Sequence, residues 1–185
     1  MLSANINLKN FRFNKNIKNT KKIKKDLKLL LCEKNIILKS LSKEYKNSYT
    51  KEIIFKLKNF HNIRIIGMGG SILGAQSIYD FLKPKIRKNF YFNNNLQSKV
   101  NYLTNKKKIN LIISKSGNTL ETISNSNVII KKSDKNLFIT ENKKSYLYLL
   151  AESLKAEIVH HNNFIGGRYS VLSEVGMLPA ELMGL

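Results

Sequence analysis

The pattern of hydrophobic and polar positions changes near residue 60 of this 185-residue chain. Before that point, apolar residues recur at the spacing of one helical face, which predicts helices over residues 21–31, from 33 onward and over 50–58. After it, short apolar runs predict strands, and most of them lead into a helical pattern. The predicted strands cover residues 63–66, 90–92, 100–103, 109–114, 137–140 and 156–160. The predicted helices cover residues 71–82, 119–131, 146–154 and 170–184, the last with an interruption near Gly176 and Pro179.

Strands that alternate with helices in this way are typical of the α/β class. We therefore expect a doubly wound, mostly parallel sheet preceded by N-terminal helices. The change of pattern divides the chain into an N-terminal basic helical segment, residues 1–60, and an α/β domain, residues 61–185. In open sheets of this class a ligand binds outside the carboxyl ends of the strands, so the loops at that edge are the first candidates for a site.

The loop after the strand at 109–114 has the composition of an anion site. Three hydroxyls and one ammonium group come from Ser114, Lys115, Ser116 and Thr119. A helix is predicted to begin at the end of this loop, and the free N–H groups of a helix N-terminus favour negative charge. The alternative is an ordinary strand–helix turn in which a hydroxyl caps the helix.

Two further loops fall at the same predicted edge. Residues 67–71 read Gly-Met-Gly-Gly-Ser, but Ile72 stands where a dinucleotide fingerprint has its third glycine, and the sequence contains no Walker A loop. These glycines instead allow backbone to approach a ligand closely, with tight helix–sheet packing as the alternative. Arg168 follows two glycines, and its planar guanidinium suits an oxyanion. The alternative is a surface arginine paired with Glu121 or Glu174.

The net charge narrows the classes of partner. Lys and Arg number 33 against 12 Asp and Glu, which gives a formal charge of +21. The lysines are dispersed, and no aromatic-rich or glycine-rich nucleic-acid motif accompanies them. We therefore expect an anionic small molecule rather than nucleic acid as the partner.

Cysteine usage and hydropathy exclude several other classes. Cys32 is the single cysteine of the sequence, which excludes an internal disulfide, and no Cys/His cluster has the spacing of a zinc site. Because it lies in an apolar stretch, we expect its thiol to be buried. No apolar run approaches the ~20 residues of a membrane span, and the N-terminus lacks the apolar core of a signal peptide. We expect a cytoplasmic protein without membrane association.

Three segments, in this order, resemble the glucose-6-phosphate isomerase family. They are Gly67-Met68-Gly69-Gly70-Ser71-Ile72-Leu73-Gly74, Ser114-Lys115-Ser116-Gly117-Asn118-Thr119-Leu120-Glu121-Thr122 and Gly166-Gly167-Arg168-Tyr169-Ser170. The resemblance covers roughly residues 60–185 and matches the family's first sugar-isomerase (SIS) domain, so it implies an SIS-type, flavodoxin-like fold. It also implies the interconversion of glucose 6-phosphate and fructose 6-phosphate without a metal or organic cofactor.

Carried over by position, the resemblance implies that four residues hold the sugar phosphate: Ser114, Lys115, Ser116 and Thr119. The loop departs from longer family members in one place, where Gly117-Asn118 stands instead of an aromatic residue and Thr. This variant is similar to the broader SIS family.

The resemblance also assigns roles around the sugar. Gly70 and Ser71 would line the sugar site. Arg168 would stabilise the enediolate that forms as a proton moves between C1 and C2, because a fixed cation lowers the energy of the growing negative charge. Glu121 would orient Arg168 or the loop rather than transfer the proton.

The acid–base residues of the family have no counterpart in this sequence. In the family the base is a Glu, and ring opening uses a His and a Lys; all three lie beyond the Gly-Gly-Arg-Tyr-Ser segment. Neither Glu174 nor Glu181 lies in a matching motif. We therefore expect an SIS domain truncated at its C-terminus, inactive alone, from an enzyme that is a homodimer at full length. The alternatives are a single-SIS phosphosugar-binding regulator or small sugar-phosphate isomerase, and a basic nucleic-acid-binding protein.

The last sixteen residues are rich in apolar side chains. They include Val171, Leu172, Val175, Met177, Leu178, Leu182, Met183 and Leu185. Because these are too many for a solvated terminal helix, we expect an exposed apolar face there that a further domain or a second subunit covers.

Overall fold

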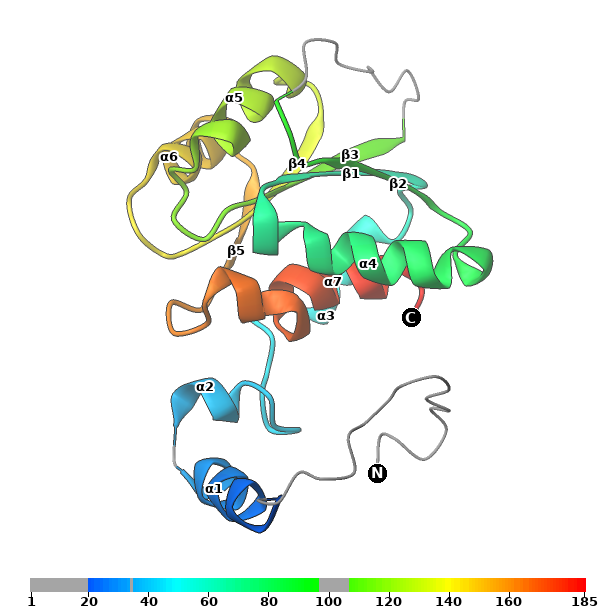
Figure 1. Cartoon of the computed structure of the whole chain (residues 1–185). Coiled ribbons are helices and arrows are strands. Elements are labelled where there is room, and N and C mark those ends of the chain that lie inside the picture. The colour runs from blue at the N-terminus through cyan, green and yellow to red at the C-terminus, as the bar shows by residue number, and fades with distance from the viewer. Residues whose placement is uncertain (1–19, 34, 97–106) are drawn as a thin grey trace.

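The computed structural model describes residues 20–33, 35–96 and 107–185, and its centre is a five-stranded parallel sheet (Figure 1). The strands are β1 (Asn62–Gly67), β2 (Asn89–Asn93), β3 (Lys108–Ile113), β4 (Lys135–Thr140) and β5 (Glu157–His160). Their order is β2-β1-β3-β4-β5, and every neighbouring pair is parallel. The predicted doubly wound α/β fold is confirmed. The predicted strand at 100–103 lies outside the described residues.

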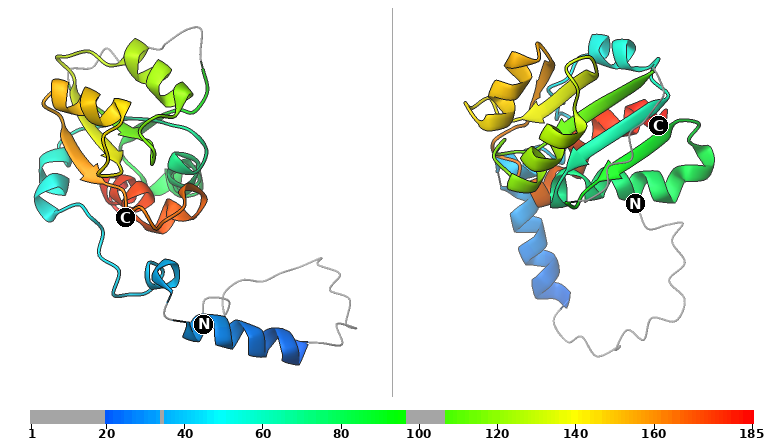
Figure 2. Two further views of the ribbon diagram at one scale, coloured as in Figure 1. Left: turned by 90° about the vertical axis from the view of Figure 1, so that its left-hand side faces the viewer. Right: turned by 90° about the horizontal axis from the view of Figure 1, so that it is seen from above.

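Helices cover both faces of the sheet. On one face lie α3 (Lys51–Leu57), α4 (Leu73–Leu82) and α7 (Glu174–Met183); on the other lie α5 (Leu120–Ile129) and α6 (Tyr146–Ser153) (Figures 1 and 2). A strand covered on both faces needs apolar residues at consecutive positions, and Ile109 and Leu111–Ile113 of β3 are fully buried. Alternate residues of the strands therefore enter two separate cores, one on each side.

The terminal helix corrects two predictions. The predicted interruption near Gly176 and Pro179 is wrong, because α7 runs through both residues and the break lies before it, at Ser173, after the 3₁₀ segment η3 (Gly167–Leu172). A Cβ on Gly176 would lie 2.1 Å from the Val171 carbonyl oxygen, so glycine allows η3 to pack against α7. The predicted exposed apolar face is also wrong, because α7 packs into the core of its own chain.

The buried residues of α7 include Val175, Leu178, Leu182 and Met183. They join the core cluster that holds one face of the sheet. Leu172 and Leu185, at the two ends of this region, remain exposed.

The first two helices lie apart from these layers. α1 (Thr20–Cys32) and the single turn α2 (Ile36–Lys39) lie away from the sheet and its covering helices (Figures 1 and 2). The Cys32 thiol is exposed rather than buried as predicted, because α1 packs against none of the sheet's helices. No helix in the described part of the chain is long and apolar enough to cross a membrane.

The third helix belongs to the packed body. The Thr50 side chain accepts a hydrogen bond from the Ile53 N–H and caps α3, at the start of the helix predicted over residues 50–58. Ile53 and Leu57 enter the same core cluster as α7. The division of the chain at residue 60 into two parts stays a prediction.

Candidate functional site

The candidate loops leave the sheet at its centre. β1 and β3 are neighbours, but the chain continues from β1 to β2 on one side and from β3 to β4 and β5 on the other. The two connections therefore diverge between β1 and β3, which is the point where sheets of this class bind ligands. The loop after β1 holds Gly70 and Ser71, and the loop after β3 holds residues 114–119.

The loop after β3 brings two of its hydroxyls together. The Ser114 Oγ and Thr119 Oγ1 atoms are 2.9 Å apart, and Ser114 is buried. Thr119 is the N-cap of α5, yet its side chain makes no capping hydrogen bond. The Ser116 hydroxyl is on the exposed side of the loop and accepts a hydrogen bond from the Asn118 N–H at 3.2 Å. The first turn of α5 thus begins beside three hydroxyl groups.

Gly117 fits this loop against the start of α6. It has a φ of +65°, and a Cβ there would lie 2.0 Å from the Ser145 Oγ. Its carbonyl accepts a hydrogen bond from the Leu147 N–H at 3.0 Å, and the Asn118 Oδ1 accepts one from the Tyr146 N–H at 2.9 Å. The Gly117-Asn118 departure from the family pattern therefore has a structural reason, since an aromatic residue at Gly117 would collide with α6.

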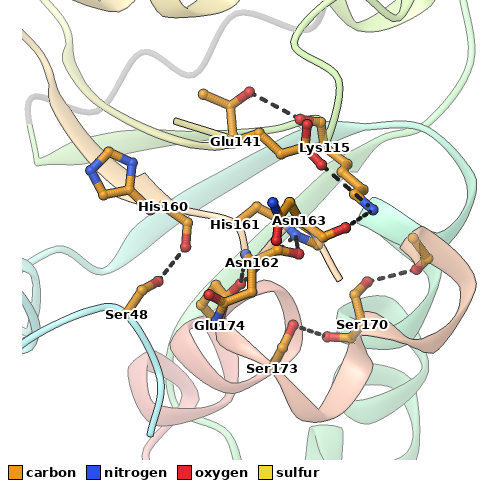
Figure 3. A network of polar contacts seen from close by, with 12 residues as sticks. Ser48, Lys115, Glu141, His160, His161, Asn162, Asn163, Ser170, Ser173 and Glu174 are labelled. Carbon is orange, nitrogen blue, oxygen red and sulfur yellow. Dashed lines mark hydrogen bonds and ion pairs between the residues drawn. The ribbon is translucent and has the colours of Figure 1, made fainter. Parts of the chain in front are cut away.

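Lys115 extends from the loop toward the next two strands. Its Nζ donates a hydrogen bond to the Asn163 carbonyl at 2.7 Å and lies 3.5 Å from the Glu141 Oε1 (Figure 3). Glu141 follows β4, and Asn163 lies between β5 and η3. Lys115 therefore connects the loop after β3 to the ends of β4 and β5.

The segment with Arg168 packs directly on the loop after β1. A Cβ on Gly70 would lie 2.1 Å from the Gly167 carbonyl oxygen, so glycine is required for this contact. The Ser170 hydroxyl lies 2.6 Å from the Gly167 carbonyl and 3.4 Å from the Gly70 carbonyl. Ser71, which ends the 3₁₀ turn η1 (Gly69–Ser71), is half-buried.

Arg168 itself is exposed. Glu121 and Glu174 are also among the described residues, and neither forms an ion pair with Arg168. Glu121 is half-buried in the first turn of α5. The alternative interpretation, a surface arginine paired with one of these two glutamates, is therefore not what the structure shows.

The structure contains a buried polar network under the end of β5 that the sequence did not predict. The fully buried Glu174 accepts hydrogen bonds from the Tyr45 hydroxyl at 2.8 Å and the Asn162 N–H at 2.9 Å. The side-chain amide of Asn162 donates to the Tyr45 oxygen at 2.7 Å. The Ser48 hydroxyl donates to the His160 carbonyl (Figure 3). Tyr45 and Glu174 are 129 positions apart, so no local pattern could have predicted their contact.

The same network holds His161. Its Nδ1 lies 3.0 Å from the Asn162 carbonyl oxygen and 3.8 Å from the Glu174 carboxylate. Burial lowers the pKa of His161 despite these neighbours, so its imidazole is neutral at pH 7. Burial, followed by the hydrogen bond to Glu174, raises the pKa of Tyr45. Both groups thus hold their uncharged forms around the buried carboxylate.

A polar pocket of about 470 Å³ adjoins this network. It is lined by Glu141, Asn142, Lys143, His160, His161, Asn162 and Asn163. Within the described ranges, no group of three His, Cys, Asp or Glu residues could hold a metal ion. The polar groups described at this edge are hydroxyls, amides, imidazoles, the Lys115 ammonium and the Glu141 carboxylate.

One family model matches most of this chain. Residues 18–184 match the model of phosphoglucose isomerase. The chain belongs to the phosphoglucose isomerase family. Among curated relatives of that family, it is 34% identical over 157 residues to glucose-6-phosphate isomerase of Acholeplasma laidlawii, with 71% of this chain and 37% of that protein covered. It is 35% identical over 140 residues to the enzyme of Methanocaldococcus jannaschii, with 70% and 34% covered. The chain thus spans about a third of the length of these isomerases.

Solved structures share the fold. A hypothetical protein from Thermus thermophilus has a TM-score of 0.62 at 23% identity, with 72% of this chain and 37% of that one covered. The c3406 protein of E. coli has a TM-score of 0.60 at 17% identity, with 90% and 92% covered. Because the identities are below 25%, these structures show the fold alone. This member of the phosphoglucose isomerase family has the SIS-type fold.

Proposed function

We propose that this chain is the phosphate-binding part of a glucose-6-phosphate isomerase, which interconverts glucose 6-phosphate and fructose 6-phosphate through an enediolate. The observation that carries the proposal is the meeting of the Ser114 and Thr119 hydroxyls at the N-terminus of α5, in a member of this family. Backbone N–H groups at a helix start and neighbouring hydroxyls are the donors that a phosphate group needs. Ser116 and Lys115 complete the proposed cradle.

The sugar extends from this cradle toward the loop after β1. Gly70 and Ser71 line its path, and the contact between Gly70 and Gly167 keeps the Arg168 segment beside them. In the isomerisation, negative charge grows on the oxygen atoms at C1 and C2 as the proton moves. Arg168 has no carboxylate partner among the described residues, so its charge is available to stabilise that enediolate. Glu121 positions the loop from the first turn of α5.

The base and the ring-opening residues come from outside this chain. Neither Glu174 nor Glu181 lies in a segment that matches the family's base motif. We place the complete active site in a longer, homodimeric enzyme in which a further domain supplies the proton transfer.

A binding titration tests the proposal. Fructose 6-phosphate added to the purified 185-residue chain should bind more tightly than inorganic phosphate, because the sugar adds contacts along the loop after β1. Isothermal titration calorimetry measures both affinities. Failure of both ligands to bind at millimolar concentration would contradict the proposed phosphate site.

A second candidate is a one-domain protein that binds a phosphosugar as a regulator or a small isomerase. Its supporting observation is that the fold matches the E. coli protein over nearly the whole length of both chains. The coding sequence after Leu185 discriminates between the two. A second strand–helix array with the family's His and Glu supports the isomerase, whereas an immediate stop codon supports the one-domain protein.

A further inference from the structure

Glu141 holds the lysine of the proposed phosphate loop from two sides. Its Oε1 lies 3.5 Å from the Lys115 Nζ, and its backbone N–H donates a hydrogen bond to the Lys115 carbonyl at 3.1 Å (Figure 3). The Lys115 ammonium also donates a hydrogen bond to the Asn163 carbonyl. The side chains of Lys115 and Glu141 are 29% and 22% exposed, so this ion pair is only partly screened by solvent.

Lys115 lies next to Ser114 in the sequence, so its ion pair with Glu141 is close to the proposed phosphate site. Its neighbour Ser114 lines the point where α5 begins, so the lysine backbone lies at the proposed cradle. A lysine has a flexible four-carbon stem and three donors, so its ammonium can serve either the carboxylate or an anion in the loop. A carboxylate this close competes with a bound phosphate for the ammonium.

We propose that Glu141 is a positioning residue that acts through Lys115 and sets the affinity of the loop for phosphorylated ligands. The ligand phosphate takes the ammonium over from Glu141, while Asn163 keeps the lysine near the Arg168 segment. The inference rests on the proposed function, since it presumes that the loop binds phosphate. Glu141 thereby weakens binding, which keeps the site from being saturated by inorganic phosphate.

The test compares three carboxylate variants of the same chain by calorimetric titration. Glu141→Gln should bind fructose 6-phosphate and inorganic phosphate about two- to fivefold more tightly, the range expected for a partly exposed ion pair. Glu141→Asp keeps the charge and should bind as the wild type does. Glu157→Gln is the matched control for net charge. It also removes a carboxylate from an ion pair, because the Glu157 Oε1 lies 3.7 Å from the Lys56 Nζ. Glu157 begins β5, so it lies at the opposite edge of the sheet from the proposed site.

A fourth variant tests whether the effect passes through the lysine. In a Lys115→Met background, Glu141→Gln should no longer change the affinity. This outcome distinguishes positioning from a general loss of structure, which would weaken binding instead of tightening it.

Each contrary result has a defined meaning. Unchanged or weaker binding by Glu141→Gln, or equal tightening by Glu157→Gln, overturns the role of Glu141 while the wild-type affinity still supports a phosphate site. Absence of binding by the wild type overturns the proposed function and this inference together.

Discussion

Ser114 and Thr119 illustrate what can be predicted at the scale of single residues. They were assigned to one site because a strand end and a helix start, five positions apart, constrain the chain between them. Their hydroxyls lie 2.9 Å apart in the structure. Lys115 lies in the same loop, but its ammonium contacts Asn163, which is 48 positions later in the sequence. No local sequence pattern predicts a contact between residues so far apart.

The loop hydroxyls support a prediction about affinity. Ser116→Ala combined with Thr119→Ala should weaken fructose 6-phosphate binding, because each lost hydrogen bond to a charged group costs about 1.5–3 kcal/mol. The effect on folding should be smaller, because the Thr119 side chain makes no capping bond to α5 and the folded state loses only the contacts of these hydroxyls with the Ser114 hydroxyl and the Asn118 N–H. Calorimetric titration and a thermal melt measure the two effects, with Ser153→Ala on exposed α6 surface as the control. If the double variant binds as tightly as the wild type, the loop is only a strand–helix turn and not a phosphate site.

His161 supports a prediction about pH. Its folded-state pKa is lowered by burial, so below the unfolded value of about 6.5 the unfolded chain binds a proton that the folded chain does not. The free energy of unfolding therefore falls as pH drops below about 6.5, by at most ~1.4 kcal/mol per pH unit for one proton. Glu174, Glu141 and Lys115 also act on this imidazole, so the wild-type slope contains their interactions.

The comparison of two neighbouring histidines isolates this contribution. His161→Asn should reduce the loss of melting temperature between about pH 7.5 and 5.5, whatever its effect on absolute stability. His160→Asn changes an exposed ring and should leave the slope as it is in the wild type. Equal slopes in all three proteins would show that His161 does not remain neutral in the fold.

At the scale of elements, the sequence predicts strands better than the packing of helices. Consecutive apolar residues identify β3 and β4 because both faces of a central parallel strand are covered. A helical pattern predicts a helix in the region of α7, although with an interruption that the structure lacks, and it does not reveal which surface the apolar face meets. Val175, Leu178 and Leu182 bury α7 in the core under its own sheet, where they meet residues far away in the sequence. The prediction of an exposed face failed for this reason.

The contact between the loop after β1 and η3 can be tested in the same terms. Gly70→Ala places a Cβ 2.1 Å from the Gly167 carbonyl oxygen and should lower the free energy of unfolding by about 1–3 kcal/mol, since neither backbone can move freely. It should also weaken fructose 6-phosphate binding by displacing the Arg168 segment. Gly167→Ala is the matched control, because a Cβ there meets no atom within 4 Å. Similar melting temperatures for both variants would contradict the close contact.

At the scale of the whole molecule, helix α1 differs most from a packed domain. Each of its five Ile and Leu side chains is at least 46% exposed, although their spacing is that of a buried face. The sequence predicts the helix and its amphipathic pattern, but the surface that the helix meets is not encoded in that pattern. The same limit applies to catalysis, because neither family membership nor the proposed phosphate loop identifies a proton-transfer base.

We expect the purified chain to bind fructose 6-phosphate without converting it to glucose 6-phosphate. General acid–base catalysis typically contributes ~10²–10⁴-fold, and a site without its base also loses the positioning of the reacting carbon atoms. Proton NMR of the sugar phosphates over hours measures the conversion directly.

An Arg168→Ala variant separates weak true turnover from a contaminating isomerase, because Arg168 is the residue proposed to stabilise the enediolate. Conversion that persists equally in this variant comes from a contaminant. Conversion by the wild-type chain that Arg168→Ala abolishes would contradict the prediction, and it would place the proton-transfer base among these 185 residues.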